Sequence, residues 1–227
     1  MFDSLKKYLR HHFHHPNYFY FMVSLILLIL VPPFSELIES RSLLLNSSFG
    51  LVILMGIFYT TANFNQFITF SILGVILFVL FVIAQQSQTF SFWNPIMTAI
   101  FFLGVFRNLI QHIFRVEKIG LNEVYASIAG YLVLGIMVTP FFFLIEQSIP
   151  HSFKLPEDTE FYDFMYFSYI TLTTIGYGDI TPVHHIAKSF TILVGIFGQL
   201  YLTILVAIII GKYLAIDIER KKSSKKD

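Results

Sequence analysis

The feature that most constrains this chain is a long run without any charged residue. Residues 42–106, a run of 65, contain no Asp, Glu, Lys or Arg. Because a helix that crosses a membrane needs about 20 mostly apolar residues, this run has room for about three spans joined by short links. Backbone groups in lipid must find hydrogen bonds within the protein, and the run lacks the strict alternation of a barrel strand. The sequence therefore predicts membrane-spanning helices.

The composition excludes several other classes of protein. Hydrophobic residues make up 56% of the 227 residues and charged residues only 13%, whereas soluble domains carry about 25% charged residues. A soluble globule of this size has too little interior to bury so much apolar surface, and the same values exclude intrinsic disorder. The near balance of 15 basic and 14 acidic residues argues against a nucleic-acid partner.

Enzymatic chemistry is not expected from this sequence. The chain has no Cys, so disulfides, thiolate metal sites and Cys nucleophiles are excluded. We find no metal-binding helix motif, Walker loop or nucleophile elbow. The segments outside the apolar runs are also too small to hold a substrate pocket. We therefore expect neither an enzyme nor a bound cofactor.

Six apolar stretches predict an all-α membrane protein with six transmembrane helices. Pro32 and Pro33 are expected to close or kink the first helix, and Asn94 and Pro95 to cap and begin the fourth. The predicted spans are residues 18–31, 43–61, 66–84, 93–113, 124–145 and 189–214.

An even number of spans places both termini on the same side of the membrane. With the termini inside, eleven Lys and Arg residues lie in the inner segments, and three, Arg41, Lys154 and Lys188, lie in the outer loops. Positive charge accumulates on the cytoplasmic side of membrane proteins. We therefore predict a multi-pass protein of the plasma or inner membrane with both termini in the cytoplasm.

The segment between the fifth and sixth spans is too long for an ordinary loop. Within it, residues 161–172 are apolar and aromatic, but this run is too short to cross a membrane and fits a re-entrant helix. The heptad Thr-Thr-Ile-Gly-Tyr-Gly-Asp follows directly at residues 173–179.

This heptad, placed between two spans and after a short helix, resembles the selectivity filter of tetrameric potassium channels. The resemblance covers residues 124–214: an outer helix, a pore helix at 161–173, a filter at 174–178 and an inner helix. It implies a homotetramer, with three identical subunits completing the central pore and potassium ions in the filter. The residues that the resemblance assigns to potassium coordination are Thr174, Ile175, Gly176 and Tyr177, with Gly178 completing the filter.

Two glycines suit such a filter because glycine reaches the left-handed backbone region without a steric penalty. The resemblance also implies that Tyr177 points away from the pore axis and packs there. Many members of the family carry a Trp pair where this chain has Tyr166 and Phe167. Phe167 cannot donate a hydrogen bond to Tyr177, whereas Tyr166 can reach Asp179, so we assign Tyr166, Phe167 and Asp179 to support of the filter.

The predicted inner helix carries a candidate gate. Gly198 stands at the family's hinge position, and the sequence favours a hinge and close helix packing about equally. Leu202, Val206 and Ile210 recur at a spacing of four. We expect these three residues to line the cavity and form an apolar constriction.

Six spans with one pore loop also resemble the voltage-gated architecture, but the charges do not follow it. Steep voltage sensing needs several charges within the membrane field. The fourth span offers only Arg107, with Arg115 at or past its inner end. Residues 18–114 therefore predict a four-helix domain that is not a voltage sensor of the usual kind. A structural collar, a lipid-facing scaffold and a site for a modulator all stay open for it.

The remaining segments are a cytoplasmic N-terminal segment (1–17), a linker (115–123) and a basic tail (215–227). Arg220, Lys221, Lys222, Lys225 and Lys226 in the tail favour a membrane anchor over a binding site for anionic lipid. The sequence as a whole predicts a channel for passive potassium flux that is not gated by voltage. The alternatives are a non-selective cation channel on the same scaffold, a potassium transporter subunit, and a membrane sensor or assembly protein with a vestigial pore.

Overall fold

A computed structural model describes residues 17–35, 41–61, 63–84, 93–116, 120–157 and 159–223 of the chain. The predicted N-terminal segment therefore lies outside the described residues except for Asn17, as do residues 224–227 of the basic tail and the side chains of the rest of that tail. The elements, in chain order, are α2 (Tyr18–Ser35), α3 (Arg41–Thr60), α4 (Phe64–Ala84), α6 (Trp93–Arg115), α7 (Leu121–Ser148), β1 (Phe153–Lys154), α8 (Phe161–Leu172), β2 (Thr181–Pro182) and α9 (His185–Ser223).

The chain is an all-α protein, and its helices agree with a multi-pass membrane protein. Among the described residues, four helices are long and apolar enough to cross a membrane, namely α4, α6, α7 and α9. The apolar parts of α2 and α3 are shorter, at Tyr18–Pro32 and Leu44–Thr60. The two short strands pair antiparallel, with Phe153 opposite Pro182.

Most helices extend past the ends of the apolar stretches, because backbone hydrogen bonding continues where hydropathy falls. The last helix, predicted over 189–214, runs from His185 to Ser223. Of the two effects expected of Pro32 and Pro33, closure of the first helix was wrong, since α2 continues through them to Ser35. A kink at these residues stays a prediction. Helix α6 begins at Trp93, which places Pro95 in the first turn, where an N–H has no partner within the helix.

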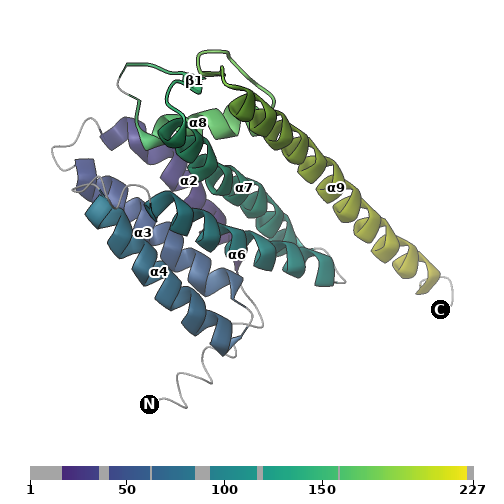
Figure 1. Cartoon of the computed structure of the whole chain (residues 1–227). Coiled ribbons are helices and arrows are strands. Elements are labelled where there is room, and N and C mark those ends of the chain that lie inside the picture. Colours follow the sequence, from purple (N-terminus) through teal and green to yellow (C-terminus); the bar gives the residue numbers. More distant parts are fainter. Residues whose placement is uncertain are drawn as a thin grey trace, which may run out of the picture.

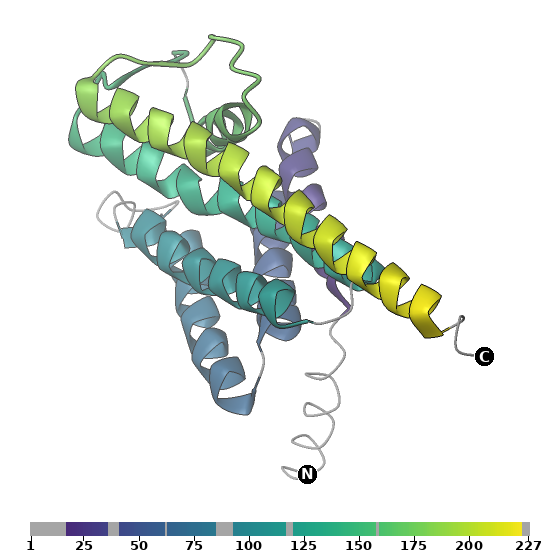
Figure 2. The same cartoon turned by 90° about the vertical axis from the view of Figure 1, so that its right-hand side faces the viewer.

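The helices form two units that share α7 (Figure 1). We call α2, α3, α4 and α6 the four-helix group, and α7, α8 and α9 with their loops the α7–α9 unit. Helix α6 packs against α7, and α2 packs against both α3 and α7. Figure 2 shows α9 running beside α7, with the four-helix group on the other side of α7.

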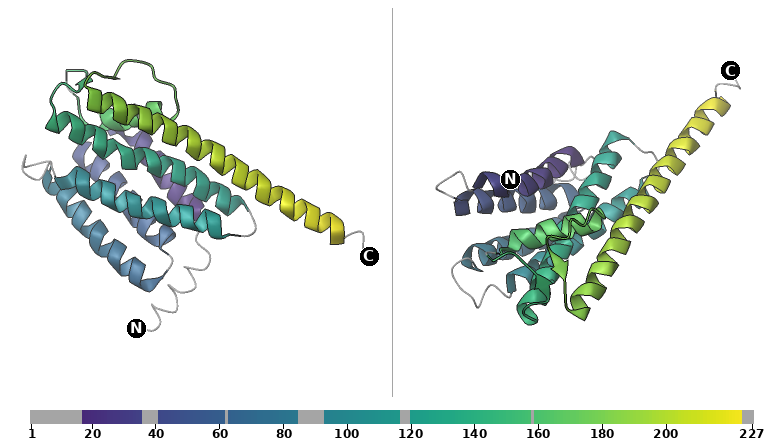
Figure 3. Two further views of the ribbon diagram at one scale, coloured as in Figure 1. Left: turned by 45° about the vertical axis from the view of Figure 1, so that its right-hand side comes forward. Right: turned by 90° about the horizontal axis from the view of Figure 1, so that it is seen from above.

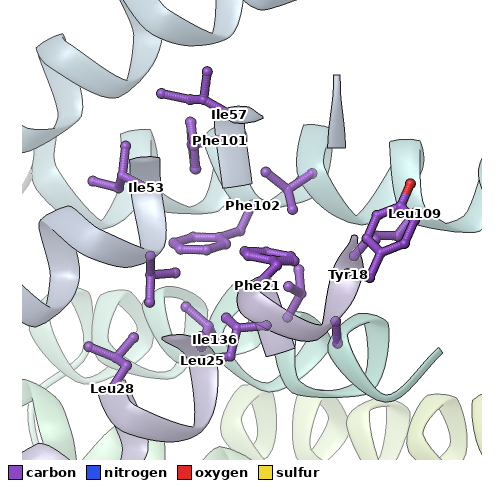
Figure 4. Packing of buried hydrophobic residues seen from close by; sticks show 14 of the residues in the cluster. Tyr18, Phe21, Leu25, Leu28, Ile53, Ile57, Phe101, Phe102, Leu109 and Ile136 are labelled. Carbon is purple, nitrogen blue, oxygen red and sulfur yellow. The ribbon is translucent and has the colours of Figure 1, made fainter. Parts of the chain in front are cut away.

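Large apolar side chains hold the four-helix group to α7. Phe21 of α2 and Phe101 and Phe102 of α6 are fully buried, and Ile136 of α7 joins the same cluster. Figure 4 shows these side chains together with Ile53 and Ile57 of α3. Each fully buried side chain of this size contributes about 1.5–3 kcal/mol relative to exposure in water.

Only five residues, 116–120, separate α6 from α7. So short a link keeps the four-helix group against the α7 of its own chain. The backbone N–H of Tyr18 also donates to Asn122 Oδ1 at 2.9 Å, which ties the start of α2 to the start of α7.

Helix α9 lies at the edge of the described structure, and one of its sides faces no other described element (Figure 3). Large apolar side chains on α9 are exposed over most of its described length, including Ile192, Phe197, Ile204 and Ile210. An exposed apolar surface of this extent indicates contact with lipid or with other chains.

Candidate functional site

The site is built around α8, a helix of 12 residues that begins at a reciprocal cap. The backbone N–H of Glu160 donates to Asp163 Oδ2 at 2.6 Å, and that of Asp163 donates to the Glu160 carbonyl at 3.1 Å. Acidic side chains near a helix N-terminus also interact favourably with its dipole. The helix ends at Leu172, where the backbone N–H of Thr173 donates to the Tyr169 carbonyl at 2.9 Å. A helix covers residues 161–172 as predicted, one residue short of the 161–173 that the resemblance implied, and its re-entry into the membrane stays a prediction.

Aromatic packing fixes α8 against α7. Phe167 is 3% exposed, and its ring centroid lies 4.8 Å from that of Phe142 and 5.5 Å from that of Phe153. Offset and edge-to-face aromatic pairs of this kind stabilise a core beyond their buried area. Phe167, which we assigned to filter support, therefore occupies the apolar core under the site.

Hydroxyl groups link α8 to α7 over long distances in sequence. Tyr131 OH donates to the Leu172 carbonyl at 2.9 Å, and Tyr169 OH donates to the Leu132 carbonyl at 2.6 Å. Ser168 Oγ adds a bond to the Gly135 carbonyl at 2.8 Å. A Cβ at Gly135 would lie 2.2 Å from the Tyr169 ring, so only glycine permits this approach.

Sequence reasoning missed these residues. Their only signal was the presence of tyrosine and serine within otherwise apolar helices, because a buried hydroxyl requires a partner. That signal does not identify the partner carbonyl, which is more than thirty residues away in each case.

The backbone after α8 alternates between two regions of conformation. Thr174, Gly176 and Gly178 have φ values of 60°, 53° and 81°, while the residues between them do not have positive φ. The left-handed region is costly for a residue with a Cβ such as Thr174. Successive carbonyl groups of an ordinary extended strand point in alternate directions, whereas a segment that changes hand at every second residue turns them toward the same side. The expectation that Gly176 and Gly178 use the left-handed backbone region agrees with these angles.

All residues from 173 to 179 are exposed in the single chain. Tyr177 is 73% exposed, so the packing expected of this side chain is not made within one chain. Gln199 of α9 donates to Thr174 Oγ1 at 3.4 Å, which places a polar group of α9 beside the start of this segment.

Tyr166 and Asp179 connect α8 to the end of the same segment. Tyr166 OH donates to Asp179 Oδ2 at 2.5 Å, so the expected contact is present. This hydrogen bond is the main reason why the pKa of Tyr166 is raised to about 12, and it also lowers the pKa of the Asp179 carboxyl. The carboxylate is therefore ionised at neutral pH and holds Asp179 against α8.

Helix α9 passes the end of α8 at Gly198. A Cβ at this position would lie 2.5 Å from the Leu172 carbonyl oxygen, so the glycine permits close packing of the two helices. Tyr201, one turn further, donates to the Ser127 carbonyl of α7 at 2.8 Å. Of the two interpretations of Gly198, close packing has this direct support, and the hinge stays a prediction.

The three candidate gate residues lie further along α9. Leu202, Val206 and Ile210 are 38%, 51% and 53% exposed, and therefore have no complete packing within the chain. Two residues beyond them, Lys212 Nζ donates to the Ile113 carbonyl at 2.9 Å and to the Phe114 and Val116 carbonyls. A cation at a helix C-terminus is favourable, and sequence analysis did not assign this residue a role.

Two comparisons with known proteins bear on the site. A family model described as "Ion channel" matches residues 129–214. The chain is also 27% identical over 116 residues to the calcium-gated potassium channel TvoK of Thermoplasma volcanium. That alignment covers 51% of this chain and 31% of the relative. The chain thus spans about a third of the length of the curated relative that it matches.

Residues 129–214 are therefore similar to an ion channel family, and half of the chain is distantly homologous to a potassium channel. The expectation that the chain is not an enzyme is confirmed by the match to an ion channel family. The apolar helices and this match together describe a multi-pass membrane protein.

Proposed function

We propose that this chain is one subunit of a homotetrameric channel that conducts potassium passively and selectively. The observation that carries the proposal is the backbone of residues 174–178, in which Thr174, Gly176 and Gly178 alone adopt positive φ. Stripping water from a cation is costly, so a selective pore must return oxygen ligands to the ion. Repeated reversal of the peptide planes is the means by which a single strand can direct successive carbonyls toward one axis.

In this proposal, four copies of the segment surround the ion. Carbonyl oxygens of Thr174, Ile175, Gly176 and Tyr177 coordinate potassium, and the Thr174 hydroxyl completes the inner site. The end of α8 at Leu172 directs the negative end of its dipole toward the cavity and favours a cation there. No cofactor is needed besides the potassium ions themselves.

The partners in this proposal are three identical subunits and the lipid bilayer. The exposed apolar side chains of α9 and the exposed side chain of Tyr177 support an assembly in which neighbouring subunits supply the missing contacts. All six apolar helices, including α2 and α3, span the plasma or inner membrane, and both termini are cytoplasmic. The basic tail serves there as an anchor or as a site for anionic lipid.

Voltage does not gate the proposed channel. Among the 23 residues of α6, only Arg107 and Arg115 are Lys, Arg, Asp or Glu. Each elementary charge moved across the field contributes about 2.3 kcal/mol per 100 mV. Two charges, one of them at the last residue of the helix, give a shallow dependence on voltage.

Flux measurements on the full chain in liposomes test the proposal. We expect potassium flux well above sodium flux at every imposed voltage, with little change between voltages. Gly176→Ala places a Cβ on a residue with φ of 53° and should abolish the potassium flux. Gly211→Ala is the matched control, because a Cβ there meets nothing within 4 Å.

Three outcomes would contradict the proposal. Equal potassium and sodium fluxes would indicate the non-selective cation channel. A saturable potassium flux that requires a driving ion or nucleotide would indicate a transporter subunit. Native mass spectrometry that finds only monomers or dimers would exclude the homotetramer.

A further inference from the structure

A polar cavity of about 370 Å³ lies in the four-helix group, far from the segment at residues 174–178. It is bounded by the end of α3, the beginning of α4 and the last turns of α6. The function proposed above makes no use of this cavity.

The face of α6 in the cavity is cationic. Arg107, Asn108, Gln111 and Arg115 line it, at positions that fall on one side of a helix over about two turns. Among the residues that line the cavity, all within the described part of the chain, none is Asp or Glu. Within the part of the chain that the structure describes, neither guanidinium has an ion-pair partner.

A carboxylate beside the cavity-lining His112 already has other partners. Glu123 of α7 lies 3.7 Å from His112 Nε2, and its other oxygen accepts from the Gly120 backbone N–H at 2.7 Å. Neither of these contacts of Glu123 is to Arg107 or Arg115, and the two arginines are the only Lys, Arg, Asp or Glu among the described residues that line the cavity.

Asn108 supplies an independent indication of a ligand. Its side chain is only 8% exposed, lines the cavity, and has its amide nitrogen buried without a hydrogen-bond partner. A buried donor without a partner is costly, and native proteins rarely leave one. The group that satisfies it must be an acceptor, and the neighbouring guanidiniums require that acceptor to carry negative charge.

The chemistry of the ligand follows from these donors. A cation is excluded by the arginines, and an apolar ligand would leave the amides unpaired. Guanidinium groups bind carboxylate and phosphate, and two of them with a buried amide match the several acceptor oxygens of a phosphate. The volume is within the range of small-molecule sites and leaves room for more than a bare phosphate ion.

We propose that this cavity binds a phosphate group between Arg107, Arg115 and the side-chain amide of Asn108. The phosphate belongs either to a soluble anion or to the head group of an anionic phospholipid. The site assigns the four-helix group a binding role, which is separate from ion conduction and does not require the chain to conduct potassium.

Binding to the full-length protein tests the site in two arms. Isothermal titration calorimetry in a neutral detergent, with inorganic phosphate as the probe, measures the soluble arm. Native mass spectrometry of protein released from vesicles of phosphatidylglycerol and phosphatidylcholine measures retention of the anionic lipid. Phosphate binding without lipid preference identifies a soluble ligand, and the reverse identifies a head group.

Three variants connect either signal to the cavity. Arg107→Gln and Arg115→Gln each remove one charged donor and should weaken binding by about tenfold or more. Asn108→Asp keeps the shape of the side chain and places a carboxylate in the cavity, so it should abolish binding. Lys188→Gln removes an equal charge from an exposed position near the beginning of α9, outside the cavity, and should leave binding unchanged.

Several results would overturn the proposal. Absence of both signals in the natural protein would exclude the site. Binding that survives in Asn108→Asp, or that is lost in Lys188→Gln, would place the anion elsewhere. Unfolding temperatures of all four variants show whether a loss of binding reflects a loss of fold.

Discussion

Hydroxyl groups of both units of this molecule donate within their own helix, and three tyrosines of the α7–α9 unit also form bonds between helices. In the four-helix group, the hydroxyls of Ser24, Thr60 and Thr98 donate to carbonyls three or four residues earlier in their own helix. In the α7–α9 unit, Tyr131, Tyr169 and Tyr201 donate to carbonyls of other helices, 41, 37 and 74 residues away.

This difference separates two kinds of packing. Apolar contact holds the four-helix group to α7, and such contact tolerates changes of side chain that keep volume and pattern. Directional bonds between helices hold α7, α8 and α9, and each bond fixes one helix at a definite position on another. The unit that carries the candidate filter is therefore the less tolerant of the two, and four substitutions test this.

Gly198→Ala should have the largest effect. Its Cβ would meet the Leu172 backbone oxygen at 2.5 Å, so one of the two helices must move, and overpacking of this kind costs about 1–3 kcal/mol. Gly56→Ala in α3 is the matched control, because the nearest atom would lie at 3.6 Å. Thermal unfolding in detergent measures both. A Gly198→Ala protein of natural stability but altered flux would favour the hinge instead.

Tyr169→Phe should have the next largest effect. It removes the bond to the Leu132 carbonyl while keeping the ring, and we expect a loss of about 1 kcal/mol in the free energy of unfolding. Thr60→Val in the four-helix group removes only a bond within α3 and should cost less than about 0.5 kcal/mol. Denaturant titration compares the two variants. Equal losses would show that the two units do not differ in the way described.

Lys212→Met tests the contact that joins the two units at their far end. The last carbonyls of α6 lose a cationic donor, which contributes about 0.3–1 kcal/mol at a helix C-terminus. We expect faster amide hydrogen exchange at the end of α6. Lys188→Met, at the other end of α9, is the control and should leave that exchange unchanged. Unaltered exchange in Lys212→Met would show that this contact does not stabilise the end of α6.

The smallest effect is expected at Tyr166 and Asp179, because both side chains are exposed. The bond lowers the pKa of Asp179 below its ordinary value of 3.8, so its contribution to stability is present above pH 3.8 and is lost as the pH falls through the lowered pKa. Tyr166→Phe should remove this part of the acid dependence. Unfolding temperature measured between pH 6 and pH 3 provides the comparison, and parallel curves for the two proteins would contradict it.

Particular residues show how far sequence reasoning reaches. The short helix at residues 161–172 and the unusual backbone at Gly176 and Gly178 were accessible, because both depend on local sequence and on glycine's lack of a Cβ. The carbonyl partner of Tyr169, the close approach at Gly135 and the bonds of Lys212 were not accessible. Each joins segments far apart in the chain, and no local pattern determines which segments meet.

The sequence by itself determined that this chain lies in a membrane as a set of helices. Residues 42–106 lack charge, and a backbone in lipid has almost no alternative to helical hydrogen bonding. The tertiary structure decided which helix faces share a core, what Gly198 contacts and which residues of other helices close the cavity beside Arg107, Asn108 and Arg115. Hydropathy specifies whether a segment lies in lipid or in water. Contacts between helices depend on the angles at which the helices pack, and these angles arise only when the side chains of different helices meet.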